Sequence, residues 1–196
     1  MRKIGLTGGA ATGKSTVSSI LGRLGAEIID VDMIAREVVA RGNPCLEMIA
    51  VYFGKDVLLE DGSLNRKKLG DIVFADKAKL EQLNAIVHPV IIERVKGILD
   101  RLAAEKSTRT PVIDAAILIE MGLDTLVDCV WLVWADRETQ IQRLVARDGM
   151  SREKAENIIR SQMPMEDKIK LADVIIDNTG TIEALETKIR ELWAEK

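Results

Sequence analysis

Short apolar runs alternate with helical patterns along most of the chain. The runs are apolar at consecutive positions, as in strands buried on both faces, and they lie at 3–7, 26–30, 111–119, 127–135 and 173–177. Helical patterns predict helices at 15–25, 33–41, 137–147, 151–161, 164–172 and 181–194, and those at 137–147, 151–161 and 164–172 are rich in Arg, Gln and Lys. Strands that alternate with helices in this way indicate an α/β fold with a parallel sheet covered by helices.

One stretch does not fit this alternation. From residue 44 to about residue 106 the pattern is helical almost throughout, with turns expected at 60–65, at 74–79 and at His88–Pro89. Pro89 would begin a new helix at its first turn, where a proline is well tolerated. The stretch is too long for one crossover between strands, so we interpret it as an inserted helical lobe.

Composition bounds the class of protein. The 196 residues, 47% hydrophobic and 30% charged, suit a single globular domain, and the net charge of −3 argues against a broad nucleic-acid-binding surface. Cys45 and Cys129 are far apart and the chain has one histidine, which argues against a Cys/His zinc site. Neither a signal-peptide pattern nor a membrane-spanning run is present, so we expect a cytoplasmic protein without a membrane partner.

The stretch GLTGGAATGKSTV carries the most specific motif. Gly8-x-x-x-x-Gly13-Lys14-Ser15 matches the phosphate-binding P-loop and lies between a predicted strand and a predicted helix. In such a loop, successive backbone N–H groups and a helix N-terminus hold phosphate, the lysine reaches the β- and γ-phosphates, and the serine hydroxyl faces Mg²⁺. The alternative, a glycine-rich turn that binds nothing, is disfavoured by this context. The predicted nucleotide-binding residues are Gly8, Gly9, Ala10, Ala11, Thr12, Gly13, Lys14, Ser15 and Thr16.

Three acidic residues are candidates for the site, and two of them lie at the end of the second predicted strand, where ligands of open α/β sheets bind. Asp30 and Asp32 come at the end of the second strand, which we expect beside the P-loop strand, so that Asp32 could face the γ-phosphate. A carboxylate there can hold Mg²⁺ or accept a proton, and either residue could instead cap the next helix. Asp114, in PVIDAAILIE, resembles a Walker B acid that holds the metal, or is a turn residue without a role.

Basic residues and one histidine are further candidates. Arg143 and Arg147 are four positions apart and share a helix face in segment 137–168, which is polar and, by its pattern, lacks an apolar stripe. We therefore expect this segment to be a mobile flap whose arginines neutralise phosphoryl charge, with a solvated surface as the alternative. His88 either touches substrate or is a packed histidine.

Together these segments resemble one family closely, that of dephospho-coenzyme A kinase. The resemblance covers essentially the whole chain and rests on IGLTGGAATGKSTV, IIDVDMIAREVV, LNAIVHPVI, ILIE, ETQIQRLVARDGMSREKAENIIRSQM and ADVIIDNTGTIEAL, in the family's order. It implies a single P-loop kinase domain, 1–196, with a five-stranded parallel sheet. Within that domain it implies a helical lobe at 32–106 for the acceptor substrate and a helical lid at 136–170.

The resemblance also implies an activity and roles for residues. The activity is ATP-dependent phosphorylation of the ribose 3′-hydroxyl of dephospho-CoA, the last step of coenzyme A synthesis, with ATP and Mg²⁺ as cofactors. Asp32, Lys14 and Arg143 would be catalytic, and Ser15, Asp32 and Asp114 would face the metal. Arg147, Asn178 and Gly180 would bind the nucleotide, and Asp32, Arg36 and His88 the acceptor.

Two segments depart from the family pattern. Ala10-Ala11-Thr12 stand where the family usually has Ile-Gly-Ser, so the backbone at Ala11 must accept a Cβ. Ala116 and Ile117 stand where Pro-Leu is usual, which affects the shape of that strand end.

Two other functions compete with this interpretation. A different nucleoside or nucleotide kinase would not need the helical insert with AIVHP. A regulatory GTPase would need a guanine-reading NKxD motif, which DNTG at 177–180 does not supply.

Overall fold

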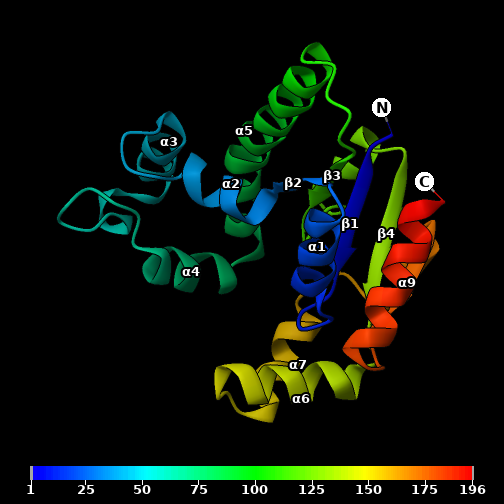
Figure 1. Ribbon diagram of the computed structural model, residues 1–196. Coiled ribbons are helices and arrows are strands. Elements are labelled where there is room, and N and C mark those ends of the chain that lie inside the picture. Colours follow the sequence, from blue (N-terminus) through cyan, green and yellow to red (C-terminus); the bar gives the residue numbers. More distant parts are fainter. Residues whose placement is uncertain (1, 196) are drawn as a thin grey trace. The chain divides into compact units, whose positions relative to one another are not determined.

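A five-stranded parallel sheet forms the centre of the computed structural model, which describes residues 2–195 (Figure 1). The strands are β1 (Ile4–Gly8), β2 (Glu27–Asp30), β3 (Pro111–Asp114), β4 (Cys129–Trp134) and β5 (Val174–Asp177). All neighbouring pairs are parallel, and the order across the sheet is β2-β3-β1-β4-β5. This confirms the predicted α/β fold with five parallel strands.

The strand order corrects one expectation. β2 does not lie beside β1, because β3 pairs with both of them. In the register across this edge, Leu6 of β1 is level with Asp114, and Asp114 is level with Asp30. The acid at the end of the strand next to the P-loop strand is therefore Asp114, and the end of β2 lies two strand spacings from β1, roughly 10 Å away.

The apolar run after β3 is a turn, not the second half of a strand as predicted. β3 ends at Asp114, and a last ladder bond runs from the Ala115 N–H to the Leu6 carbonyl, 3.0 Å. Leu118 then packs fully buried against Gly5, where an added Cβ would lie 2.7 Å from Leu118 Cδ2. Ala115 and Leu118 are buried against the sheet, whereas Ile117 is exposed.

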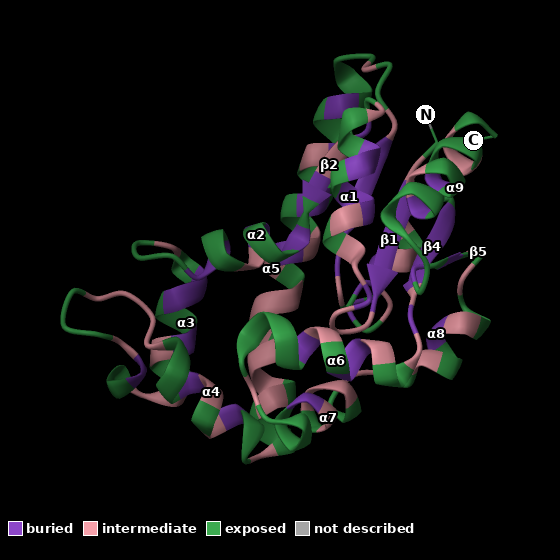
Figure 2. Cartoon of the chain, turned by 60° about the horizontal axis from the view of Figure 1, so that its bottom comes forward, coloured by how far each residue is buried: buried purple, intermediate pink, exposed green. Residues whose placement is uncertain are grey.

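Two helices bury the opposite face of the sheet. α1 (Lys14–Arg23) and α9 (Ile182–Ala194) lie side by side along β1 and β4 (Figure 1). Their apolar faces join the strands in the main core, in which β1 and β4 are buried almost throughout (Figure 2). The largest buried members are Ile4, Leu6, Ile20, Leu21, Trp131, Ile176 and Ile189. This packing fixes the end of β1 and the start of α1, the two elements that bound the P-loop.

The segment after β4 forms three helices beyond the carboxyl ends of the strands: α6 (Arg137–Asp148), α7 (Arg152–Arg160) and α8 (Met165–Lys170). Our expectation that 137–168 lacks an apolar stripe is wrong. Ile141, Leu144 and Ala155 form a small buried cluster, and Ala10 and Ala11 of the P-loop pack against it. The stripe is short, because most of the segment's other positions are charged or polar, but it packs α6 and α7 against the loop.

Residues 31–100 form a second compact unit, made of helices. It holds α2 (Val31–Val38), α3 (Pro44–Phe53), a 3₁₀ turn (Lys55–Val57), α4 (Arg66–Phe74) and most of α5 (Lys77–Ala104). The expected break at His88–Pro89 is wrong, because α5 runs through Pro89 without interruption. Proline removes one helical hydrogen bond and tends to kink a helix, yet a helix of 28 residues has enough remaining bonds to continue past it. Within residues 2–195, no helix is both long and apolar enough to cross a membrane.

Candidate phosphate-binding site

The P-loop joins β1 to α1 at the carboxyl edge of the sheet. Gly13 caps α1 with a left-handed φ of 92°, and a Cβ there would overlap the side-chain amide nitrogen of Asn178. At Gly8 a Cβ would lie 2.6 Å from Thr12 Oγ1. Both glycines of the motif are therefore required by close approach, and the helix N-terminus that follows favours an anion.

The middle of the loop is a tight turn over Gly9–Thr12. The Thr12 N–H and hydroxyl both donate to the Gly9 carbonyl, at 3.3 and 3.0 Å. Ala11, the third residue of the turn, has φ +56°, whereas Ala10 has a negative φ. This is the pattern of a type II turn, whose third position usually takes glycine. The loop thus accepts the Cβ of Ala11 in a left-handed conformation that L-residues rarely adopt.

Lys14 and Asp114 meet at this edge. Lys14 Nζ lies 2.5 Å from Asp114 Oδ1, and the two side chains are 15% and 8% exposed. The contact follows from the register, because the first residue of α1 lies above the end of β3. The partly buried ammonium group of Lys14, at the N-terminus of α1, therefore points toward the end of β3.

Arg143 and Asn178 bind the outer carbonyls of the loop. Arg143, on α6, donates to the carbonyls of Ala11 and Thr12 at 3.4 Å each and to that of Asn178 at 2.7 Å. Asn178, in the loop after β5, donates its side-chain amide to the Thr12 carbonyl, 2.7 Å. Two side chains from distant parts of the sequence therefore hold the carbonyl side of one turn.

The remaining predicted nucleotide residues are peripheral in this structure. Arg147 is 67% exposed and is paired with Asp148 at 2.8 Å, a hydrogen bond that raises the pKa of its guanidinium. Ser15 is exposed in the first turn of α1, whereas Thr16 is half-buried there and donates its N–H to the Gly13 carbonyl. Gly180 is exposed in the loop after β5.

The predicted acceptor residues belong to the helical unit. Asp32 and Arg36 are exposed, one turn apart on α2, which starts directly after Asp30. His88 is half-buried within α5, and burial lowers the pKa of its imidazole. The structure thus groups Lys14, Asp114, Arg143 and Asn178 around the loop and carries the acceptor candidates on two helices of the other unit.

Sequence reasoning missed two side chains close to the loop and one beside the turn after β3. The Ala10 N–H donates to Gln162 Oε1, 2.8 Å, and an added Cβ at Gly9 would lie 3.1 Å from Gln140 Nε2. Lys168 ends the charged segment 137–168 but is 1% exposed; its Nζ lies 2.8 Å from the Ala116 carbonyl and 2.9 Å from Glu120. No local pattern distinguishes these residues from surface polar residues.

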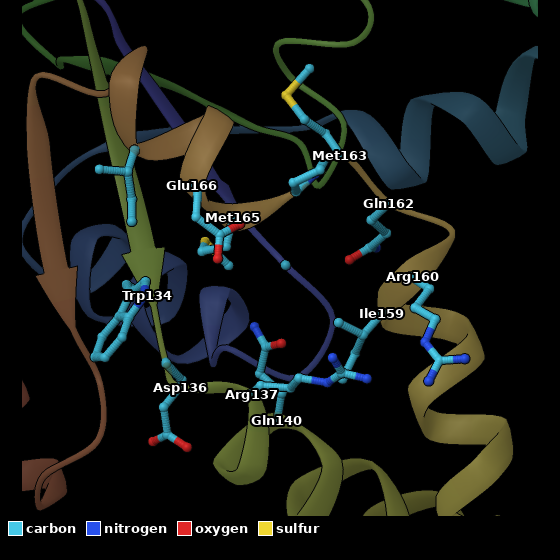
Figure 3. A pocket seen from close by; sticks show the side chains of 14 residues that line it. Trp134, Asp136, Arg137, Gln140, Ile159, Arg160, Gln162, Met163, Met165 and Glu166 are labelled. Atoms are coloured by element: carbon cyan, nitrogen blue, oxygen red, sulfur yellow. The ribbon is translucent and has the colours of Figure 1, made fainter.

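A pocket of about 460 Å³ borders the loop at Gly9 (Figure 3). Its walls come from the end of β4, the first turns of α6, the end of α7 and the connection to α8. Apolar surface comes from Trp134, Met163 and Met165. The pocket is also lined by two arginines, each ion-paired with Glu156: Nη2 lies 3.8 Å from Glu156 Oε2 for Arg137 and 3.1 Å for Arg160. Gln140 and Gln162 line this pocket and approach the loop from it.

The arrangement suits recognition of a polyphosphate. A glycine-bounded loop, a helix N-terminus and a lysine converge on one place, and side chains fix the outer groups of the turn. In the part of the chain that the structure describes, no group of three or more His, Cys, Asp or Glu side chains could hold a metal ion by itself.

Known proteins similar to this chain share one description. A family model described as dephospho-CoA kinase matches residues 2–184. The dephospho-CoA kinase of Geobacter sulfurreducens is 50% identical over 198 residues, which is 100% of this chain and 99% of the relative. That of Carboxydothermus hydrogenoformans is 46% identical over 95% of this chain and 90% of the relative.

Solved structures agree with these matches. A Thermus thermophilus protein superposes with a TM-score of 0.84 at 34% identity, covering 99% of this chain and 97% of its own. The dephospho-CoA kinase from Campylobacter jejuni gives 0.72 at 29% identity, covering 100% and 97%. Shikimate kinase from Acinetobacter baumannii, at 18% identity and a TM-score of 0.57, shares the fold.

Proposed function

The chain belongs to the dephospho-CoA kinase family, and we propose that its P-loop is the ATP site for the family's reaction. That reaction transfers phosphate to the ribose hydroxyl of dephospho-CoA, the final step of coenzyme A biosynthesis. One observation carries the proposal: the loop between β1 and α1 brings Lys14 and Asp114 together at a helix N-terminus. Lys14 would leave Asp114 for the β- and γ-phosphates when ATP binds.

Asp32 is our candidate for the base. The 3′-hydroxyl oxygen attacks the γ-phosphorus, the bond from that phosphorus to the β,γ-bridging oxygen breaks, and ADP leaves. The hydroxyl proton passes to the carboxylate of Asp32, which is exposed and follows the end of β2 by two residues. A positioned carboxylate contributes both the proton acceptor and the alignment of a weak nucleophile.

Mg²⁺ suits the oxygen donors among our candidate residues. The hydroxyl of Ser15 and the carboxylates of Asp114 and Asp32 are the hard ligands that Mg²⁺ prefers, and such sites take most other ligands from phosphate and water. When bound, Mg²⁺ would neutralise charge on the transferred phosphoryl group. Asp114 is held by Lys14 and so is already oriented toward the loop.

Segment 136–170 is our candidate for the lid, and Arg143 for the residue that meets charge on the γ-phosphoryl group. Arg143 is anchored beside the loop by three carbonyls, and Arg147 lies one turn further along α6. Asn178 and Gly180 follow β5 at the same edge of the sheet, and we propose that they lie near adenine. These roles rest on the position of α6 and of the β5 loop against the P-loop.

The helical lobe, 32–106, is our candidate for the acceptor site, with Arg36 and His88 as contacts to dephospho-CoA. Arg36 is exposed on the same helix as Asp32, and its guanidinium suits the diphosphate of the acceptor. The cytoplasmic location stays a prediction from the sequence.

Thermal unfolding with ATP, GTP and dephospho-CoA, combined with an assay for coenzyme A formation, tests the proposal. ATP should raise the melting temperature of the wild type, and dephospho-CoA should do so independently. In Lys14→Ala the shift with ATP should shrink while the shift with dephospho-CoA persists. If ATP raises the melting temperature of Lys14→Ala as much as that of the wild type, the assignment of the P-loop as the ATP site is wrong.

A further inference from the structure

We propose that Gln162 is a positioning residue of the donor site, which holds the left-handed turn at Ala11 in its phosphate-binding shape. The inference rests on the proposed role of the P-loop as the ATP site. Gln162 lies in the connection between α7 and α8, far from the loop in sequence. Its side chain lines the pocket (Figure 3), and the side-chain oxygen accepts the backbone N–H of Ala10 at 2.8 Å.

The turn that Gln162 contacts is one that its own residues do not favour. Ala10 and Ala11 are the central residues of the turn closed by Thr12 and Gly9, and Ala11 has φ +56°. A residue with a Cβ in this region is strained and persists only where its surroundings over-determine the conformation. Hydrogen bonds from other parts of the chain to the adjoining peptide groups must therefore stabilise the left-handed conformation at Ala11. A glycine at this position would need less of this stabilisation.

Side chains take the outward polar groups on both sides of Ala11. On the N-terminal side the Ala10 N–H is held by Gln162. On the C-terminal side Arg143 and Asn178 hold the carbonyls of Ala11 and Thr12. These bonds fix the orientation of the peptide planes and hence the direction of the amides that follow in the loop. Among these side chains, Gln162 accepts a hydrogen bond from the turn, whereas Arg143 and Asn178 donate to it. Neither of those two contacts can therefore substitute for the one that Gln162 makes.

The contact also links the loop to the lid candidate. Ala10 and Ala11 pack against the cluster of Ile141, Leu144 and Ala155 on α6 and α7. Gln162 comes two residues after the end of α7 and is half-buried in the wall of the pocket. A displacement of this connection would therefore release the Ala10 N–H, which makes Gln162 a coupling point between lid position and loop shape.

The test combines replacement of Gln162 with relief of the strain at Ala11. Gln162→Met keeps the length of the side chain and removes the acceptor, and Gln162→Asn keeps an amide that is too short to reach Ala10. Each should weaken ATP binding and raise KM for ATP about 5- to 10-fold, the effect of one lost hydrogen bond. In the same two variants, the KM for dephospho-CoA should change less than about 2-fold.

Ala11→Gly is the decisive partner variant. If Gln162 acts by holding the turn, glycine at position 11 makes that support less necessary, so Gln162→Met in the Ala11→Gly background should raise the ATP KM less than about 2-fold. Gln142→Met is the matched control: Gln142 is exposed on α6 and donates to Glu138 at 3.4 Å. It should leave both KM values unchanged.

A second readout does not depend on activity. Hydrogen exchange of the Ala10 amide in the wild-type protein without ligand should quicken about 5-fold or more in Gln162→Met and stay unchanged in Gln142→Met. Unchanged exchange and ATP affinity in both Gln162 variants would overturn the inference, as would a loss that Ala11→Gly does not rescue. Lys14→Ala, measured alongside, separates this result from a failure of the ATP-site proposal: weak ATP binding in Lys14→Ala with normal binding in Gln162→Met rejects Gln162 alone.

Discussion

The P-loop region and the helical unit hold their candidate residues in different ways. Around the loop, backbone geometry does most of the positioning: Gly8 and Gly13 admit no side chain, and the strand register brings Asp114 to Lys14. In the helical unit, residues 31–100, the candidates are side chains on helix surfaces. Asp32 and Arg36 are exposed on α2, and His88 is half-buried on α5.

The difference teaches which kind of site a local pattern can describe. A phosphate site made of consecutive amides needs a fixed backbone path, so its glycines, lysine and serine must stand at fixed spacing. An acceptor site made of side chains from separate helices has no such spacing. Variants around the loop should therefore impair ATP binding and phosphoryl transfer, whereas variants in the helical unit should impair the steps that involve the acceptor, either its binding or the activation of its hydroxyl.

The largest expected effect is that of Lys14→Ala. Removing a preorganised charge at a transferred phosphoryl group costs roughly 3 kcal/mol or more, so kcat/KM should fall by about 10² or more. The fold should remain, but the melting temperature should drop because Asp114 stays behind, nearly buried and without its ammonium partner. Steady-state kinetics and thermal unfolding measure the two effects.

A second variant keeps these two effects apart. Adding Asp114→Asn to Lys14→Ala removes the stranded charge and should restore part of the melting temperature without restoring activity. Lys188→Ala, at an exposed pair with Glu191, is the surface control and should change neither. Near-normal turnover in Lys14→Ala would contradict the P-loop assignment.

Asp32→Asn tests the other region and should rank next. We expect the fold and most ATP binding to persist while kcat falls roughly 10²-fold, the range for losing a general base. Asp30→Asn should do less, because Asp30 ends β2 one strand position from the helix that carries Asp32. If Asp30→Asn is the more damaging change and Asp32→Asn keeps near-normal kcat, the base has been placed on the wrong residue.

Much of the fold was predictable because its signals are local. Four of the five strands and the helices outside 44–106 were predicted within a few residues, from apolar runs and helical patterns, whereas the third strand was predicted to continue to residue 119 and ends at Asp114. The errors arise where an apolar run does not form a strand and where a proline does not end a helix. Residues 115–119 form a turn in which Ala115 and Leu118 are buried against the sheet, and Pro89 lies inside a long helix. The position of β3 between β1 and β2 depends on crossover topology, which no local window contains.

The candidate site was predictable to a similar limit. The loop residues lie together in the structure, as the motif predicts, and Asn178, which the family resemblance implied, donates a hydrogen bond to the loop. Lys168 and Gln162 were missed because burial of a lysine, or of a glutamine beside a backbone amide, is decided by tertiary packing. The left-handed conformation at Ala11 belongs to the same class, since alanine gives no sign of it in sequence.

Arg143→Ala should have an intermediate effect and sharpens the division between donor and acceptor. On our proposal kcat falls about 10-fold or more, whereas the dissociation constant of dephospho-CoA changes less than about 2-fold, because the interaction strengthens in the transition state. Some loss of ATP affinity is expected as well, since the side chain also braces the carbonyls of Ala11 and Thr12. Arg190→Ala, which removes an exposed ion pair with Glu186, is the control and should leave kcat and both binding constants unchanged. A main effect on dephospho-CoA binding would make Arg143 an acceptor clamp.

The smallest expected effect concerns His88 and the acid side of the stability curve. Burial lowers the pKa of His88 in the folded protein below its unfolded value of about 6.5, so the unfolded chain binds its proton first. The stabilising contribution of the neutral imidazole is therefore complete above about pH 6.5 and is lost as pH falls toward the folded pKa.

His88→Gln should remove that dependence. The difference in melting temperature between pH 8 and pH 5 should shrink by about 1–2 °C relative to the wild type, a small effect because the side chain is only half-buried. His88 is the only histidine of the chain, so its imidazole resonance can be followed alone. If that resonance shifts when dephospho-CoA is added and His88→Gln weakens acceptor binding, His88 contacts substrate. If neither occurs while the pH effect remains, His88 is a packed histidine and the acceptor site must be sought elsewhere on the helical unit.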